Sequence, residues 1–183
     1  MEDLELVKSV LNGNINSFNE IIYRYESSIY RFILAMVKEP EEAKDITQDV
    51  FITLYNKLYT YRGKSKLSSW IYQIARNKSI DYIRRNKRII KLSIEEAFDI
   101  SSKEPMPEQH FEFKETKEEL ENFIKCLDDI TRQIIILKGL NEDMKFSDIA
   151  DILNVNVSTV KTKYYRLWDK YNKYLDEKRC KAL

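Results

Sequence analysis

The residues of this sequence whose chemistry is easiest to interpret lie near the C-terminus, in the segment 157–170. Val160 and Leu167 fall at helical spacing there and predict a buried face. The remaining positions carry hydroxyl, ammonium and guanidinium groups, which can hydrogen-bond base edges and neutralise phosphates. These side chains are Ser158, Thr159, Lys161, Thr162, Lys163, Tyr165 and Arg166. The pattern predicts a helix that lies in the major groove of DNA, and the alternative is a helical hairpin with a basic, solvated face.

A second polar and basic stretch spans residues 59–88. Its first part, YTYRGKSKLSSW, combines aromatic rings, which stack on unpaired bases, with hydroxyl groups, which hydrogen-bond base edges. Its second part predicts a helix to about residue 88 whose cations can follow a phosphate backbone. The candidate side chains are Tyr61, Arg62, Lys64, Ser65, Lys66, Ser68 and Ser69 in the loop and Arg76, Arg84, Arg85 and Arg88 on the helix. The aromatic rings could instead edge a core, and for Trp70 we favour that interpretation.

The third group is acidic and lies on a predicted helix that begins at Pro40. The face opposite the predicted core carries Asp45, Gln48, Asp49 and Ile52. Such a face suits a partner helix that bears Arg or Lys, because charge-assisted hydrogen bonds would set the register around one apolar contact. A solvated helix face is the alternative. Asp45 and Asp49 could also ligate Mg²⁺, but no further acid or histidine lies at a suitable position, so we expect no metal site.

Helices must position all three groups. The 183 residues include only 3 Gly and 3 Pro, and apolar residues recur at spacings of three and four almost throughout. The sequence therefore predicts an all-α protein of two small helical domains, 1–90 and 118–183, joined by a flexible acidic linker, 91–117. The charge follows the same division, since residues 61–91 hold ten basic and one acidic side chain, whereas residues 92–121 hold ten acidic and three basic. Blocks of alternating sign favour separate binding faces.

Local signals predict where several elements begin. Ser17 opens an S-x-x-E capping box, and Ser68 or Ser69 is placed to cap the basic helix. Ser147 can cap a short helix ahead of the DNA-reading helix. Asn154 falls between these two helices, where the turn often needs the left-handed backbone that Asn tolerates. The second domain is therefore expected to end in a helix-turn-helix.

Composition excludes several classes of protein. No stretch has the apolar length of a membrane span, and the acidic start MEDLEL lacks the cationic region of a secretory signal. We therefore expect a cytoplasmic protein that does not insert into membranes. Cys126 and Cys180 are too few and too far apart to indicate a disulfide framework or a metal site. No cofactor is expected.

Three blocks together resemble a known family, the bacterial RNA polymerase sigma factors of the extracytoplasmic-function (ECF) kind. DITQDVFITLYNKL (45–58) is similar to the polymerase-binding helix, and YRGKSKLSSWIYQIARNKSIDYIRRNKR (61–88) to the promoter-melting segment. FSDIADILNVNVSTVKTKYYRLW (146–168) is similar to the reader of the minus-thirty-five element. Their order and spacing also agree, and the resemblance covers nearly the whole chain.

The resemblance implies a non-enzymatic protein that directs polymerase to promoters and helps melt the minus-ten element. Its implied partners are the clamp helices of the polymerase's largest subunit, the flap, promoter DNA and an anti-sigma protein. It assigns polymerase binding to the acidic face, capture of a flipped minus-ten base to the loop 61–70, and upstream reading to the helix that starts at Val157. Around the captured base it adds to the candidates Gln73, Asn77 and Asp81.

Two other classes are compatible with parts of the sequence. A free-standing helix-turn-helix regulator would use the C-terminal domain but would leave the acidic face and the polar loop without a role. A metal-dependent nuclease would explain cations beside Asp45 and Asp49, but it needs a tighter cluster of carboxylates than the sequence offers.

Overall fold

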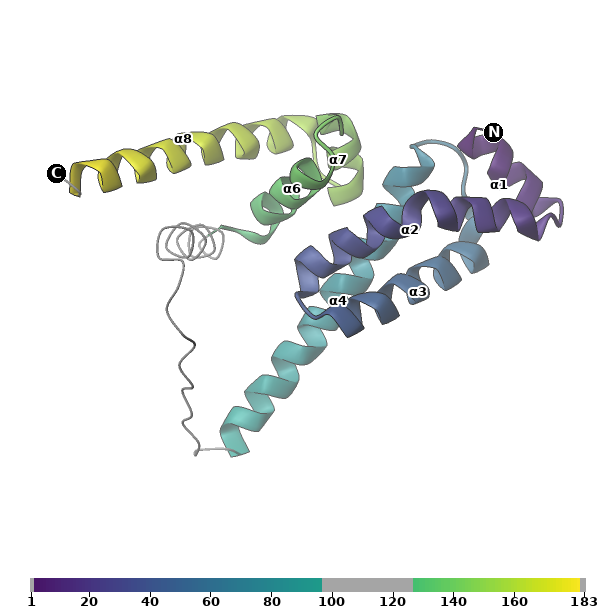
Figure 1. The fold of residues 1–183 in the computed structure, drawn as a ribbon, viewed down its shortest axis with the longest axis horizontal. Coiled ribbons are helices and arrows are strands. Elements are labelled where there is room, and N and C mark those ends of the chain that lie inside the picture. Colours follow the sequence, from purple (N-terminus) through teal and green to yellow (C-terminus); the bar gives the residue numbers. More distant parts are fainter. Residues whose placement is uncertain (1, 97–126, 182–183) are drawn as a thin grey trace, which may run out of the picture.

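The computed structural model describes residues 2–96 and 127–181, and the side chains of residues 2–86 and 127–173. In these segments the fold is helical, without a strand, which confirms the predicted all-α class (Figure 1). The helices are α1 (Asp3–Leu11), α2 (Ile15–Val37), α3 (Pro40–Lys57), the short 3₁₀ helix η1 (Leu58–Thr60), α4 (Leu67–Glu96), α6 (Asp129–Leu140), α7 (Phe146–Leu153) and α8 (Val157–Lys181).

The first four helices form an N-terminal bundle around α2. This helix contacts α1, α3 and α4, and Figure 1 shows α3 beside it and α4 crossing the bundle diagonally. Apolar residues that recur at helical spacing are fully buried at its centre, among them Phe32, Ile33, Leu54 and Ile71. Their burial removes apolar surface from water, which is the main stabilising term of such a bundle.

The start of α2 differs from the prediction. The helix begins at Ile15, and its N-cap is Asn14, whose side chain accepts a hydrogen bond from the Asn16 amide. Ser17 is therefore already inside the helix, where it is buried and its hydroxyl donates to Ser9 Oγ over 2.7 Å. The capping-box prediction at Ser17 is wrong because Asn14, a residue type that caps as well as Ser, lies at the N-cap one turn earlier.

The basic helix α4 is longer at both ends than predicted. It begins at Leu67, so neither Ser68 nor Ser69 is its cap, and it continues for 30 residues to Glu96, beyond Arg88. It therefore passes through the predicted domain boundary at residue 90. The remainder of the predicted linker, 97–117, lies outside the described residues.

The C-terminal domain comprises α6, α7 and α8. Helix α7 ends at Leu153, and the φ of 54° and ψ of 51° of its C-cap, Asn154, are the predicted left-handed conformation. This turn packs α8 against α7 in a helix-turn-helix, with Ile149 and Val160 buried between the helices. Helix α7 begins at Phe146, one residue before the predicted cap Ser147, and its N-cap Lys145 makes no side-chain capping bond.

The two helical domains also pack against each other. Helix α4 contacts α7, and α2 contacts α6, so their buried apolar residues form one continuous cluster. The ends of α4 and α8 project away from this body in Figure 1. Within the two described segments, no helix has the length and apolarity required to cross a bilayer.

Candidate nucleic-acid interface

Helix α3 separates its predicted binding residues from its core residues. Asp45, Gln48, Asp49 and Ile52 are all exposed, and 59% of the Ile52 surface is accessible. The positions between them, such as Val50, are buried against the bundle. The structure thus places the four predicted residues on one acidic and amide-bearing face with a single apolar residue at its end.

This acidic face forms one wall of a groove, and α4 forms the other. The groove has a volume of about 480 Å³ and is lined by residues that include Asp45, Gln48, Asp49, Asp81 and Arg85. Lys78 Nζ lies 3.4 Å from Asp49 Oδ2, but the Asp49 side chain is 64% exposed, so solvent weakens this ion pair. Asp81 and Arg85 were predicted to bind the promoter. They therefore lie beside the residues predicted to bind polymerase.

The loop before α4 has a defined shape. The Tyr61 hydroxyl donates a hydrogen bond to the Ser65 carbonyl over 2.6 Å, and its ring stacks on Trp70 with 5.3 Å between centroids. Gly63 lies at a φ of +68°, a backbone conformation that side chains with a Cβ rarely adopt. The turn leaves Arg62 and Lys64 exposed to solvent. Trp70 packs against the core, in agreement with the structural role favoured for it.

One face of α4 meets the C-terminal domain. Gln73 Nε2 donates to the Asp151 carbonyl over 2.7 Å, and Arg76 Nε donates to Gln133 Oε1 over 2.6 Å. Two turns after Arg76, Arg84 lines a cavity of about 250 Å³ between α4 and α6. These three predicted promoter residues thus lie on the same side of one helix, towards the second domain.

The first turn of α4 lies at the same interface. Lys66 Nζ forms an ion pair with Asp148 Oδ2 over 2.7 Å. Ser68 and Ser69 line a cavity of about 450 Å³ beside that pair. Ser69 is 1% exposed, and its hydroxyl has no hydrogen-bond partner among the described atoms. The structure therefore places these three predicted loop residues between the domains, with Ser69 inaccessible in this arrangement.

The remaining predicted residues of α4 are distributed differently. Asn77, Asp81 and Arg85 are exposed on the side that includes the α3 groove. Arg88 lies on the helix, but its side chain is outside the described side chains. The predicted promoter set is thus divided between two sides of α4, which its sequence order alone does not reveal.

The predicted reading helix, α8, presents most of its candidates to solvent. The exposed ones are Ser158, Lys161, Thr162, Tyr165 and Arg166, with Thr159 half-buried beside them. Lys163 is different, because its amine donates to Asp128 Oδ1 over 3.0 Å and therefore points back towards α6.

Asp128 is a positioning residue that we did not anticipate from the sequence. It is the N-cap of α6, where it accepts hydrogen bonds from the Thr131 amide over 3.1 Å and the Thr131 hydroxyl over 2.6 Å. Desolvation opposes ionisation of this carboxyl, but the bonds from Thr131 and Lys163 outweigh it and lower its pKa from 3.8 to about 2. The sequence does contain a signal for this N-cap, because Asp128 lies three residues before Thr131 at the start of an apolar run. Asp128 thereby links the first helix of the domain to α8, the predicted DNA-reading helix.

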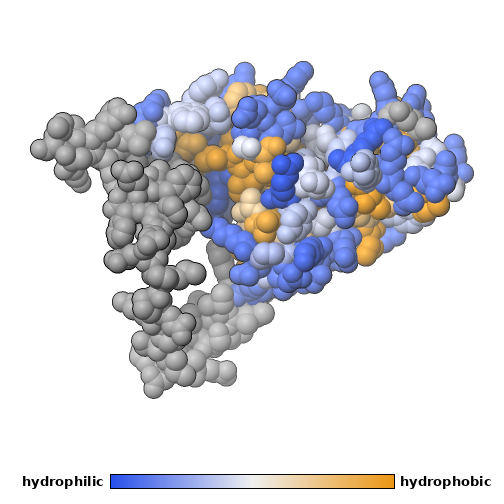
Figure 2. All heavy atoms as spheres, in the orientation of Figure 1, coloured by the Kyte–Doolittle hydropathy of each residue, from blue (hydrophilic) through white to orange (hydrophobic). Residues whose placement is uncertain are grey.

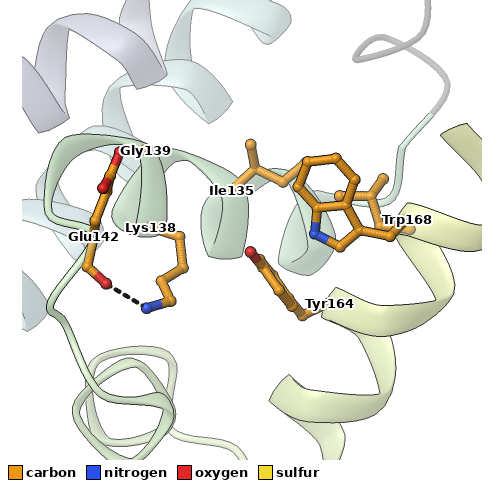
Figure 3. A pocket seen from close by; sticks show the side chains of 7 residues that line it. Ile135, Lys138, Gly139, Glu142, Tyr164 and Trp168 are labelled. Atoms are coloured by element: carbon orange, nitrogen blue, oxygen red, sulfur yellow. Dashed lines mark hydrogen bonds between the residues drawn. The ribbon is translucent and has the colours of Figure 1, made fainter.

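A shallow apolar groove lies between α6 and α8. It has a volume of about 390 Å³, and Figure 3 shows Tyr164 and Trp168 extending from α8 across Ile135 of α6. At one end, Lys138 Nζ donates to the Glu142 carbonyl over 2.6 Å. Hydrophobic side chains gather over this part of the C-terminal domain in Figure 2. Local sequence patterns did not predict this groove, because its two walls are more than twenty residues apart in sequence.

The carboxylates do not form a metal centre in the described parts of the chain. There, no three His, Cys, Asp or Glu side chains come close enough together to hold a metal ion. Across the groove from Asp45 and Asp49, helix α4 places the cations Lys78 and Arg85 beside Asp81.

Comparison with known proteins identifies the family. The model of Sigma-70 region 2 matches residues 21–89, and that of Sigma-70, region 4, matches residues 117–167. The ECF RNA polymerase sigma factor SigW of Bacillus subtilis (strain 168) is 32% identical over 168 residues, which cover 87% of this chain and 89% of SigW. The chain belongs to the ECF RNA polymerase sigma factors.

Other relatives agree with this assignment. The ECF sigma factor SigM of Bacillus subtilis (strain 168) is 29% identical over 82% of this chain and 90% of its own length. The fold is that of CnrH, solved in complex with the cytosolic domain of CnrY, with a TM-score of 0.68 and 18% identity over 96% of this chain and 97% of that one. It is also that of the sigma factor RpoE of Bartonella quintana, solved with the anti-sigma factor NepR, with a TM-score of 0.63 and 21% identity over 87% and 96% of the two chains. As an ECF sigma factor, the chain acts in promoter-specific initiation by RNA polymerase.

Proposed function

We propose that this sigma factor holds core RNA polymerase through the exposed face of α3. Asp45, Gln48 and Asp49 would receive cationic and polar side chains of the clamp helices, and Ile52 would supply the apolar contact. The observation that carries this proposal is the division of α3 into a buried apolar face and an exposed acidic one. Two surfaces with cationic and hydroxyl side chains remain for DNA.

The first DNA surface comprises the loop 61–66 and helix α4. Its role is to capture a base and the adjoining phosphates of the minus-ten strand. The exposed cations Arg62, Lys64, Arg84 and Arg85 support phosphate binding. Unstacking costs a few kcal/mol per base, and capture of the flipped base offsets this cost without a catalytic residue.

The second DNA surface is the exposed side of α8. Ser158, Lys161 and Thr162 lie at the start of the helix, where side chains of a helix-turn-helix reach base edges. Arg166 lies one turn further, where it can meet a phosphate. Lys163 is held at Asp128, so in the proposed interface it positions the helix instead of reading bases.

Two further protein partners are proposed. The apolar groove between α6 and α8 is a surface on which the polymerase flap can dock, because its aromatic walls can bury apolar side chains. An anti-sigma protein is proposed because the related RpoE was solved in complex with one.

Reconstituted transcription tests the proposed function. Core polymerase with this chain should give transcripts from promoters that core polymerase alone does not use, and permanganate should detect unpaired thymines near the start site. A free-standing helix-turn-helix regulator would bind the same DNA without producing either signal. Failure to form any new transcript with active core polymerase would contradict the proposal.

A further inference from the structure

A cavity of about 450 Å³ lies where the first turn of α4 meets α2 and the C-terminal domain. The N-terminal bundle supplies one wall, and the segment from the end of α6 to the start of α7 supplies the other. Small molecules bind in cavities of roughly 300 to 1,000 Å³, so the space is large enough for one. The proposed contacts with polymerase and promoter DNA do not fill this cavity.

Ser69 brings an unused hydrogen-bond donor to the cavity. Its side chain is 1% exposed, and its hydroxyl has no partner among the described atoms. A buried serine in a helix commonly donates to the carbonyl four residues earlier, as Ser79 does to Ala75 over 2.9 Å. For Ser69 that carbonyl belongs to Ser65, which precedes the helix and accepts from Tyr61 instead. A buried hydroxyl left without a partner is unfavourable, so an acceptor from a ligand would stabilise this site.

The backbone at the start of α4 adds further donors. The first intrahelical hydrogen bond runs from the Trp70 amide to the Lys66 carbonyl over 3.2 Å. The amides of Leu67, Ser68 and Ser69 precede it, and no described atom accepts a hydrogen bond from them. The helix dipole also places partial positive charge at this end. Together with the Ser69 hydroxyl, these amides favour an anion that has several acceptor oxygens.

Cationic side chains complete the electrostatics of the cavity. Three cations and two carboxylates line it, and one of the carboxylates, Asp148, is paired with Lys66. Arg31 of α2 has no ion-pair partner in the part of the chain that the structure describes. Burial raises the pKa of Tyr72, and the Ser28 hydroxyl and the Arg31 charge oppose this rise, which places both groups near the Tyr72 hydroxyl. The cavity thus offers one uncommitted guanidinium beside several hydroxyl and amide donors.

We propose that this cavity binds the phosphate group of a small phosphorylated ligand. The phosphate oxygens accept hydrogen bonds from the Ser69 hydroxyl and from the amides of Ser68 and Ser69, and Arg31 neutralises the charge. A phosphate monoester suits these donors because it carries a charge of about −1.5 to −2 and three strong acceptor oxygens. Since both domains line the cavity, an occupied site stabilises the packed chain against unfolding.

Two probes test the site in the full-length chain, inorganic phosphate and adenosine monophosphate. Millimolar amounts of either should shift the amide proton signals of Ser68 and Ser69 in NMR spectra and raise the midpoint of thermal unfolding. Chloride at equal ionic strength and adenosine without phosphate are the controls and should do neither. Equal dissociation constants for the two probes would identify free phosphate as the ligand, whereas tighter binding of adenosine monophosphate would identify a phosphate ester.

Two serines of α4 form a matched pair of variants. Ser69→Ala should raise the dissociation constant of phosphate roughly tenfold, the effect of losing a hydrogen bond to a charged group. It should not lower the unfolding midpoint of the ligand-free chain, because the hydroxyl has no partner there. Ser79→Ala removes an equally buried hydroxyl that is bonded within the helix, outside the cavity, so phosphate affinity should stay as it is.

Charge changes on the two walls should act in opposite directions. Arg31→Gln should weaken phosphate binding roughly two- to fivefold, as expected for an exposed charge pair. Asp143→Asn removes an exposed carboxylate from the opposite wall and should tighten binding by a similar factor. Arg85→Gln, an exposed change in the groove between α3 and α4, should have little effect.

Three results would overturn the proposal. They are unchanged Ser68 and Ser69 amide signals in millimolar phosphate, the same shifts in chloride at equal ionic strength, and equal phosphate affinity of the two serine variants. None of them would affect the proposed contacts with polymerase and promoter, because reconstituted transcription tests those contacts separately.

Discussion

Asp128 couples the stability of the C-terminal domain to the placement of α8, its proposed reading helix. Its carboxylate caps α6 through Thr131 and holds Lys163 of α8. Asp128→Ala should reduce the free energy of unfolding at pH 7 by about 1 kcal/mol, the usual effect of losing an N-cap. Asp129→Ala, which removes a neighbouring carboxylate that is 82% exposed, should change it by only a few tenths. Urea denaturation of the full chain measures both, and equal effects would contradict the capping role.

The same carboxylate predicts a pH dependence. Its pKa is lowered from 3.8 to about 2, so the contribution of its charge to stability is complete above about pH 4. That contribution is lost as pH falls through about 2. Asp128→Asn keeps the capping oxygen but not the charge. The difference in free energy of unfolding between this variant and the original chain should therefore shrink as pH falls from about 4 to about 2. A carboxyl carbon titration followed by NMR checks the pKa, and an ordinary value near 3.8 would contradict the assignment.

Lys161 and Lys163 are two residues apart but are predicted to have different roles. Lys161 is exposed on the side of α8 proposed to face DNA, whereas the Lys163 amine is held by Asp128. Lys161→Ala should change the bases preferred in the upstream element. Loss of a contact with a base edge removes about 1 to 3 kcal/mol of discrimination against the wrong base. Lys163→Met should leave the preferred bases as they are. Selection from a randomised promoter library measures this, and a changed motif for Lys163→Met alone would reverse the two roles.

Residue identity alone could not distinguish these two lysines. The spacing of Val160 and Leu167 correctly predicted the buried side of α8. The position of Lys163 depends on a partner 35 residues away, and local periodicity holds no information about such a contact. Ser69 illustrates the same limit, since its hydroxyl type indicated an accessible loop residue, but tertiary packing buries it.

Helix α3 carries the prediction for polymerase binding. Replacing Asp45 and Asp49 together by Lys should abolish association with core polymerase, because both charges then repel a cationic partner. The fold should persist, since both side chains are exposed. Glu26→Lys, an exposed charge reversal on α2, is the control and should bind normally. Normal co-purification of the folded double variant with core polymerase would disprove the assignment.

The loop before α4 carries the prediction for strand opening. Tyr61→Phe removes the hydrogen bond to the Ser65 carbonyl and should loosen the loop by about 1 kcal/mol, which lowers the fraction of open promoter several-fold. Polymerase binding should not change. Tyr59→Phe, at a ring that is 68% exposed, removes an equivalent hydroxyl outside the folded turn. Permanganate reactivity of promoter thymines measures opening, and equal reactivity of the two variants would show that the Tyr61 bond is dispensable.

At the scale of elements, the apolar period predicted which residues face inward better than it predicted where helices end. Pro40 begins α3 as expected, because a proline at the first helical position loses no hydrogen bond. The predicted ends of α4 were wrong. The choice among competing cap residues and the continuation of the helix past Arg88 depend on several small local energies, none of which decides the end alone.

The arrangement of the two domains was not predictable from local patterns. Arg76 and Gln133 are 57 residues apart, and neither has a sequence signal that points to the other. The family resemblance gave the order of the predicted binding surfaces, but the contacts between α4 and α7 emerge only from the folded structure.

Ionic strength should change the shape of the whole molecule. The Lys66–Asp148 pair is partly exposed, so raising salt from about 0.05 M to about 0.5 M should screen it and favour separated domains. Small-angle X-ray scattering of the free chain should show a larger radius of gyration at high salt. The radius of gyration of Asp148→Asn should already be larger at low salt and should increase less when salt is raised. A radius independent of salt in both proteins would show that apolar contacts alone hold the closed arrangement.

In the proposed function, the uninterrupted length of α4 fixes the spacing of its contacts with the promoter. Its 30 residues form a rod of about 45 Å, and no loop interrupts the path from Gln73 to Arg84. The eleven residue steps from Gln73 to Arg84 make about three turns, which keeps both side chains in phase and about 16 Å apart. This distance equals about five base steps along a DNA strand. An alanine inserted after Ile80 would rotate Arg84 by about 100° relative to Gln73 and lengthen the rod by about 1.5 Å, so in the proposed function the helical phase, more than the charge, sets which phosphate Arg84 meets.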